Sequence, residues 1–312
     1  MLGKTAGGLY WMFRYLERSE NTARLMAAGQ RIALTRSHAD DEWISVLETT
    51  ATLDSYSARY GEVTRDNAIQ WMLCDRDNTS SVMTVIESAR NNARLVRTAL
   101  TREVWESVNE SWMTLKDALS QKVGERELPQ VLTLIRNRSA HVRGAFAGTM
   151  LRNDIYNFAR LGTFIERADN TARLLDVKSY VLLPSASAVG SSLDNVQWET
   201  ILRSVSAEGA YRMTYGQDVR ARNIAQFLIL DRRMPRSLAF SVGKLVDNYG
   251  YLADCYGTRL DSHAKAGALH SDFLAVGIDE ILDAGLHEFI QAFLRDVAEV
   301  GSQTEVDYRF YA

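Results

Sequence analysis

Two nearly identical nine-residue segments hold most of the side chains in this sequence that could do chemistry together. Residues 17–25 read ERSENTARL and residues 166–174 read ERADNTARL, so seven of the nine positions are identical and Asp169 keeps the charge of Glu20. Paired guanidinium groups can bind a carboxylate or a phosphate through bidentate contacts. A carboxylate whose pKa is raised by its surroundings can instead transfer protons. Either chemistry requires the two segments to meet in space.

Both segments place these side chains three or four residues apart, the spacing at which side chains contact one another along a helix. The predicted pairs are Arg14–Glu17, Glu17–Asn21 and Glu20–Arg24 in the first segment, and Glu166–Asn170 and Asp169–Arg173 in the second. The residues of these pairs form the candidate binding site. We expect the two polar faces to meet if the segments pack about a pseudo-twofold axis.

Three interpretations of the two polar faces remain open. They could form a buried polar network that fixes the register of two long helices, a binding or catalytic site, or two faces exposed to solvent. Retention of amide and charge types in both segments favours the first two, because exposed faces drift freely. Replacing Glu166 with Gln should cost several kcal/mol in a buried charge network and little on a solvated face.

The two segments belong to a longer internal repeat. Trp43 and Trp198 are each followed seventeen residues later by Tyr-Gly, at an offset of 155, and DRDNTSSV from Asp75 matches DRRMPRSL from Asp231 at an offset of 156. The nine-residue segments are offset by 149, so the three matches keep their order. A repeat of this kind defines the architecture before any local feature does. We predict one domain, 1–312, built from two repeats at about 1–120 and 150–312 with a pseudo-twofold relation.

Composition and apolar spacing predict an all-α fold, an internally duplicated helical bundle. The chain has three prolines, and so few helix breakers favour long helices. Apolar residues recur at helical spacing around both segments. Helices are predicted at 9–25, 43–60, 67–73, 80–98, 102–119, 129–138, 194–213, 221–230, 237–256 and 279–300, with loops at 123–125 and 185–192.

Other candidate sites are weaker. Arg90, Arg94 and Arg97 are spaced along one helix face and form either an anion-binding stripe or a solvated face. Cys74 falls where the second repeat has Leu230, which predicts a core position rather than a nucleophile. The sequence contains no HExxH, no pair of Glu-x-x-His motifs and no phosphate-binding loop. We therefore expect neither a metal nor a cofactor.

Charge and cysteine content narrow the class of protein. Thirty-six basic and 39 acidic residues give a net charge of −3, which disfavours a dedicated nucleic-acid binder. Two cysteines cannot form a disulfide framework and fit a reducing compartment. The first predicted helix is too charged for a signal peptide or a membrane span. We predict a cytoplasmic protein without a nucleic-acid or membrane partner.

Three stretches of the sequence resemble the bacterial alpha-E family. They are LGKTAGGLYWMFRYLERSENTARL (2–25), IESARNNARLVRTALTREVWESVN (86–109) and SAHVRGAFAGTMLRNDIYNFARLGTFIERADNTARLLD (139–176). Together they extend the resemblance to nearly the whole chain. The resemblance implies a helical protein found alongside, or fused to, circularly permuted ATP-grasp proteins and transglutaminase-like proteases.

The association with these proteins suggests the expected function. We expect a non-catalytic accessory or interaction subunit of an ATP-grasp-linked system that makes or modifies peptides by amide ligation. Its partners would be the ATP-grasp protein and the transglutaminase-like protease, and its ligand a peptide or an amino acid. The alternative is an enzyme that acts on a peptide or amino-acid derivative through the Glu/Arg cluster. A homodimeric structural protein is the third possibility.

Overall fold

The computed structural model describes residues 1–33, 39–180 and 192–311, with their side chains outside 32–42 and 177–196. Within these ranges the chain forms helices and no strand, which confirms the all-α class. The predicted loop at 185–192 lies almost entirely outside the described residues. None of the described helices is long and apolar enough to cross a membrane.

The helices fall into two consecutive sets that pack in the same order. The first set is α1 (Gly3–Ala33), α2 (Ala39–Thr49), α3 (Leu53–Tyr60), α4 (Arg65–Leu73), α5 (Val82–Leu95), the 3-10 turn η1 (Arg97–Ala99), α6 (Arg102–Ala118) and α7 (Leu128–Thr149). The second set is α8 (Asp154–Tyr180), α9 (Ser192–Ser204), α10 (Glu208–Tyr215), α11 (Ala221–Leu230), α12 (Leu238–Tyr256), α13 (Asp261–Ala275), α14 (Ile278–Ala284) and α15 (Leu286–Asp307).

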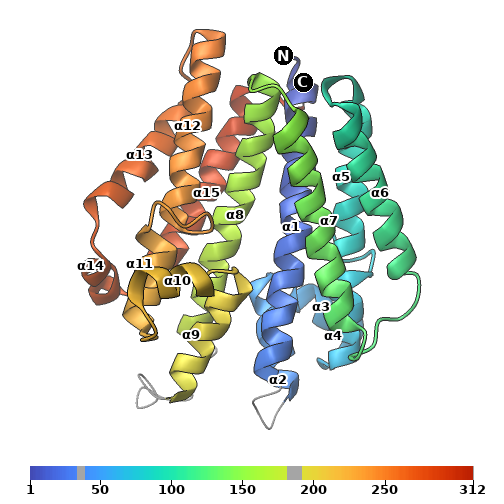
Figure 1. Cartoon of the computed structure of the whole chain (residues 1–312), viewed down its shortest axis with the longest axis vertical. Coiled ribbons are helices and arrows are strands. Elements are labelled where there is room, and N and C mark those ends of the chain that lie inside the picture. Colours follow the sequence, from blue (N-terminus) through green and yellow to red (C-terminus); the bar gives the residue numbers. More distant parts are fainter. Residues whose placement is uncertain (34–38, 181–191, 312) are drawn as a thin grey trace.

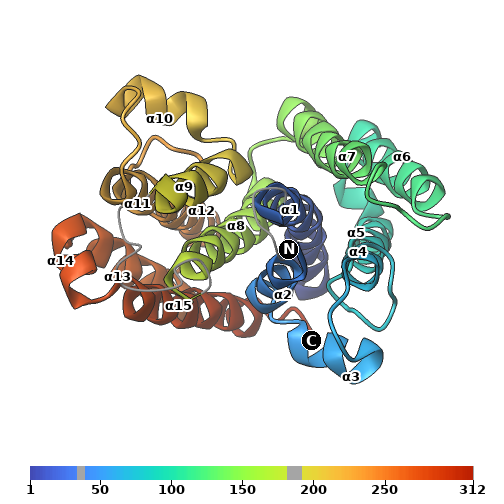
Figure 2. The same ribbon diagram turned by 90° about the horizontal axis from the view of Figure 1, so that it is seen from below.

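The long helices α1 and α8 lie side by side at the centre and run in the same direction (Figure 1). Seen along their axes, α5, α6 and α7 gather around α1, and α12, α13 and α15 gather around α8 (Figure 2). α1 also contacts α9, and α8 contacts α2, so each central helix touches the second helix of the other set. A Cβ atom at Gly162 would collide with the carbonyl oxygen of Tyr10. Glycine therefore allows the close approach of α1 and α8.

Two of the predicted helices are each broken at one residue with a left-handed backbone. The predicted helix 43–60 ends at α2 and restarts as α3, because Ala51 has φ = 54°. The predicted helix 194–213 is divided into α9 and α10 in the same way by Ser206, which has φ = 55°. Non-glycine residues seldom adopt this conformation, so apolar spacing could not reveal either break.

The turns that follow these breaks are built alike. The hydroxyl of Tyr56 accepts a hydrogen bond from the backbone N–H of Thr64, and that of Tyr211 accepts one from Arg220. Tyr56 stacks on Tyr60 with ring centroids 5.2 Å apart, and the equivalent pair Tyr211 and Tyr215 stacks at 5.0 Å. The matched tyrosine positions Tyr60 and Tyr215 thus stand in matching turns.

Three other predictions needed correction, and one helix was not predicted. The first helix extends beyond 9–25 to all of α1, and the helix predicted at 129–138 continues to the end of α7. The prediction 279–300 is two helices, since Gly285 (φ = 107°) separates α14 from α15. Sequence reasoning missed α13 entirely. The helix predicted at 221–230 agrees with α11 at both ends, and Ser237 caps α12 through the N–H of Phe240.

The C-terminal residues return to the start of α1. The ring of Phe310 lies 5.3 Å from that of Tyr10 and 6.3 Å from that of Phe158. A side chain at Gly7 would meet Phe310. Phe310 therefore packs onto both central helices at the end where they begin, at the top of Figure 1.

Candidate functional site

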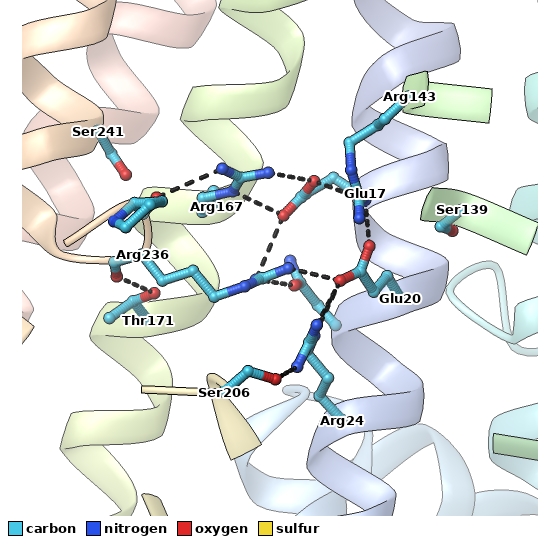
Figure 3. Close-up of polar contacts among 12 residues, drawn as sticks. Glu17, Glu20, Arg24, Ser139, Arg143, Arg167, Thr171, Ser206, Arg236 and Ser241 are labelled. Carbon is cyan, nitrogen blue, oxygen red and sulfur yellow. Dashed lines mark hydrogen bonds and ion pairs between the residues drawn. The ribbon is translucent and has the colours of Figure 1, made fainter. Parts of the chain in front are cut away.

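The two repeated segments, one on α1 and one on α8, face each other and form ion pairs with each other. Nε and Nη2 of Arg167 donate to the two carboxylate oxygens of Glu17 at 2.9 and 3.0 Å (Figure 3). Nε and Nη2 of Arg18 donate to Glu166 at 2.5 and 2.9 Å. Each Glu-Arg dipeptide thus binds the glutamate of the other with a bidentate contact, the strongest form of this ion pair. We call Glu17–Arg167 and Arg18–Glu166 the exchange pairs.

The two glutamates of the exchange pairs are buried against the neighbouring helices. Glu17 and Glu166 are buried, with 2% and 4% of their surface exposed. Ser19 and Ser139 place α1 against α7, since both hydroxyls donate to the carbonyl oxygen of Leu16. Buried charges persist only when they are paired and hydrogen-bonded, and the bidentate contacts meet that condition.

Three more arginines converge on the carboxylate of Glu20, and we call them the outer arginines. Arg24 Nε donates from the next turn of α1 at 2.9 Å, and Arg236 Nη2 donates at 2.6 Å (Figure 3). Arg143 of α7 is hydrogen-bonded to the same carboxylate. Arg143 and Arg236 also lie 3.6 and 3.3 Å from Glu17.

The connection between α11 and α12 is fixed onto α8 so that Arg236 reaches across to α1. Thr171 Oγ1 donates to the carbonyl oxygen of Arg236 at 2.9 Å, and Arg167 Nη1 donates to that of Pro235 at 3.3 Å. Arg236 Nη1 then donates to Asn21 Oδ1 at 3.1 Å. This buried arginine therefore joins both central helices through one short connection.

The corresponding region around Glu166 is simpler. Arg14 Nε adds a bond to Glu166 at 3.1 Å. Asp169, the counterpart of Glu20, is bound by Arg173 of its own helix at 2.8 and 3.2 Å. The side chain of Asp169 is 28% exposed, whereas that of Glu20 is 1% exposed.

Arginine neighbours keep the buried carboxylates ionised. Burial alone would raise the pKa of Glu17, but Arg167, Arg236 and Arg143 outweigh it and hold the pKa well below its usual value. Burial is likewise outweighed at Glu166, where Arg18 and Arg14 lower the pKa. A glutamate with a lowered pKa cannot serve as a proton donor near neutral pH.

The structure brings most of the predicted residues together, with different partners. The pairs Glu20–Arg24 and Asp169–Arg173 form as predicted. The other three intrahelical pairs, which also lie within the described residues, do not form. The remaining predicted residues are bound as follows: Arg14 to Glu166, Glu17 to Arg167, Asn21 to Arg236 and Glu166 to Arg18, while Asn170 has a buried Oδ1 without a hydrogen-bond partner among the described residues.

The interpretation of both faces as solvated is wrong for the three glutamates, which are all buried. Sequence reasoning also missed four arginines that bind them, namely Arg18, Arg143, Arg167 and Arg236. Arg18 and Arg167 directly follow the glutamates in both segments, so the repeated Glu-Arg dipeptide was a usable signal. Arg143 has no counterpart in the repeat, and Arg236 stands where the first repeat has Ser80 (236 − 156).

The predicted arginine stripe and Cys74 make contacts that are typical of packing. The guanidinium carbon of Arg90 lies 4.2 Å from the ring centre of Trp112, and that of Arg97 lies 5.5 Å from Trp105. Two arginines of the predicted stripe therefore stack on tryptophans of α6. Burial, followed by the charge of Asp75, raises the pKa of Cys74 to about 11. In the described ranges, no three His, Cys, Asp or Glu side chains are grouped closely enough to hold a metal ion.

Comparison with known proteins places this geometry in a family context. Residues 1–308 match a family model described as a predicted alpha-helical domain with a conserved ER motif. The match includes both exchange pairs and the connection that carries Arg236. No curated protein and no solved structure shows significant similarity to the chain.

Proposed function

This chain belongs to the Alpha-E family, and on that basis we propose that it is a non-catalytic accessory subunit of an ATP-grasp-linked amide-ligation system. It would dock onto the ATP-grasp protein in the cytoplasm and present a peptide or amino-acid substrate to it. A transglutaminase-like protease is the second partner of this proposal. The sequence resemblance described above supplies the choice of partners.

Sequestration of the glutamates is the observation that supports a non-catalytic role. Glu17 and Glu166 are each held by a bidentate arginine and buried. An enzyme working through this cluster would need one carboxylate that is open to its substrate and able to exchange a proton. The two carboxylates instead act as structural anions that join α1 to α8.

We also propose that the domain is a fused duplication and that the Glu-Arg dipeptides of the exchange pairs are two copies of the ER motif that the family description names. Reciprocal binding of Glu17 by Arg167 and of Glu166 by Arg18 supports this, because a twofold relation makes each half supply what the other lacks. The third Glu-Arg dipeptide, Glu125-Arg126, is exposed and lies outside α1 and α8.

Co-elution of purified proteins tests the accessory role. The chain, the ATP-grasp protein from the same source and their mixture would be separated by size-exclusion chromatography with light scattering. We expect a shared peak with a defined stoichiometry. An ATP-grasp enzyme from an unrelated pathway serves as the control and should elute separately.

Separate peaks for the cognate pair at micromolar concentration would refute a stable complex. In that case the ligase activity of the ATP-grasp protein would be measured with and without the chain, to detect a transient complex. If the rate is also unchanged, the accessory role is wrong.

A further inference from the structure

Arginines outnumber carboxylates around Glu17 and Glu20. In the part of the chain whose side chains are described, the ion pairs of Arg167, Arg236, Arg143 and Arg24 lead to these two glutamates and to no third acid. Four guanidinium groups therefore share two carboxylates, which leaves two positive charges. Uncompensated charge in a buried setting is unfavourable.

Arg136 adds to the same surplus from α7. Its Nε is buried and has no hydrogen-bond partner among the described residues. Burial lowers the pKa of Arg136, and the nearby charges of Arg24 and Arg31 lower it further, against the attraction of Glu20. Arg136 therefore carries a charge near α1 that the described carboxylates do not neutralise.

A buried amide donor next to the outer arginines also lacks an acceptor. Asn21 is 3% exposed, and its Oδ1 accepts from Arg236. Its Nδ2 is buried without a partner among the described residues. A buried donor left unpaired is costly. Guanidinium and amide donors without acceptors together indicate a missing group that is negatively charged and rich in oxygen.

We infer that the outer arginines, with Arg136 and Asn21, form a binding site for an oxyanion, the carboxylate of a peptide. Arg143 provides the entry to this site, because its side chain is 29% exposed while Glu20 beneath it is buried. Arg24 Nη1 donates to the hydroxyl of the exposed Ser206 at 2.7 Å. Planar guanidinium groups match the two oxygens of a carboxylate, and they bind phosphate by the same chemistry.

This inference rests on the proposed function only for the source of the oxyanion. Amide ligation consumes a carboxylate, so a subunit that presents the substrate would hold that group or one beside it. Binding itself is a property of the isolated chain. It can therefore be tested separately from the complex with the ATP-grasp protein.

Calorimetric titration of the full chain at low ionic strength tests the site. The probes are N-acetyl-Ala-Ala with a free C-terminal carboxylate, the same peptide as its C-terminal amide, and inorganic phosphate. We expect the free carboxylate to bind and the amide to show no binding. Binding of phosphate alone would support an oxyanion site and identify phosphate as its source.

Substitutions on α7 locate the binding. Arg136→Gln and Arg143→Gln should each weaken probe binding about tenfold or more, since each removes a charged donor. Arg136→Gln should also raise the melting temperature of the unliganded chain, because it removes an uncompensated charge. Arg138→Gln is the matched control: Arg138 lies on the same helix and pairs with Glu110 at the surface, so binding should not change.

Two results would overturn the inference. One is the absence of binding by both the carboxylate and phosphate at millimolar concentration. The other is equal affinity in wild type and in the folded Arg136→Gln and Arg143→Gln variants. Neither result would bear on whether the chain co-elutes with the ATP-grasp protein, which is measured without these probes.

Discussion

Glu20 receives guanidinium groups from α1, from α7 and from the α11–α12 connection, whereas its counterpart Asp169 is bound by Arg173 of its own helix. Both residues stand three positions after the glutamate of an exchange pair. The first is almost inaccessible to solvent, and the second has more than a quarter of its side chain exposed. The two regions thus have the exchange pairs in common, and they differ in the outer arginines, which surround Glu20 and not Asp169.

This difference distinguishes the joining of α1 to α8 from the gathering of positive charge around Glu20. The exchange pairs are nearly symmetric, and both of them join α1 to α8. The outer arginines are present around Glu20 alone within the described residues, and Arg236 reaches it because the α11–α12 connection has arginine where the α4–α5 connection has Ser80. The Glu-Arg dipeptide therefore joins the two helices, while the surplus of positive charge comes from Arg143 and Arg236, which have no arginine at an equivalent position around Asp169 in the described ranges.

Removing the glutamates of the exchange pairs should have the largest effects on the stability of the fold. Glu17→Gln leaves Arg167 without its anion and takes one of their two carboxylates from Arg236 and Arg143. We therefore expect a loss of about 3–5 kcal/mol in the free energy of unfolding. Glu166→Gln should cost less, roughly 2–3 kcal/mol, because water can reach Arg18, whose side chain is 27% exposed. Urea denaturation at pH 7 measures both losses. Equal losses would contradict the difference between the two regions.

Removing the carboxylates of Glu20 and Asp169 should show a clearer difference in stability between the two regions. Glu20→Gln should cost roughly 2–3 kcal/mol, because three arginines lose a buried partner. Asp169→Asn should cost less than about 1 kcal/mol, the usual worth of a partly exposed pair four residues apart. The exposed pair Glu199–Arg203 offers a control, since Glu199→Gln should change stability by less than about 0.5 kcal/mol.

Acid should weaken the region around Glu17 and Glu20. Their pKa values are lowered in the folded state, so they stabilise the fold above the unfolded value of about 4.3. That stability is lost as the pH falls from about 4.5 toward the folded values, at up to about 1.4 kcal/mol per pH unit for each group. Urea midpoints from pH 6 to pH 3 should fall more steeply in wild type than in Glu17→Gln. Parallel curves would refute the assignment.

The smallest difference concerns the left-handed residues at the two helix breaks. Ala51→Gly should stabilise the fold by about 0.5 kcal/mol, because relief of the left-handed conformation exceeds the added flexibility of the unfolded chain. Ser206→Gly should give no gain, since Arg24 loses the hydroxyl that accepts its hydrogen bond. Thermal melts of the two variants make the comparison. An equal gain in both would show that Ser206 contributes nothing to the outer arginines.

Sequence reasoning found the segments that meet but not the way they meet. The repeat placed Glu17 and Glu166 on equivalent faces, and the spacing rule correctly paired Glu20 with Arg24. The same rule failed for Arg14 and Glu17, because two parallel helices in contact offer partners closer than those along one helix. Arg18 and Arg167 each point toward the opposite helix. The rotation of α1 and α8 about their axes, which sets this direction, depends on packing that includes the close approach at Gly162. Arg236 lay beyond prediction, since its reach depends on a connection fixed by Thr171.

The parallel pairing of α1 with α8 has a consequence for the order of synthesis. Glu17 leaves the ribosome 149 residues ahead of Glu166 (166 − 17), an interval of roughly 7–30 s at usual rates of elongation. During that time α1 can pack only against α2, α5 and α7, and its polar face stays wet. We expect a ribosome-bound chain that ends before α8 to be cleaved readily within α1, and one that includes α12 to be protected. If the shorter chain resists protease equally, the first half folds without its partner.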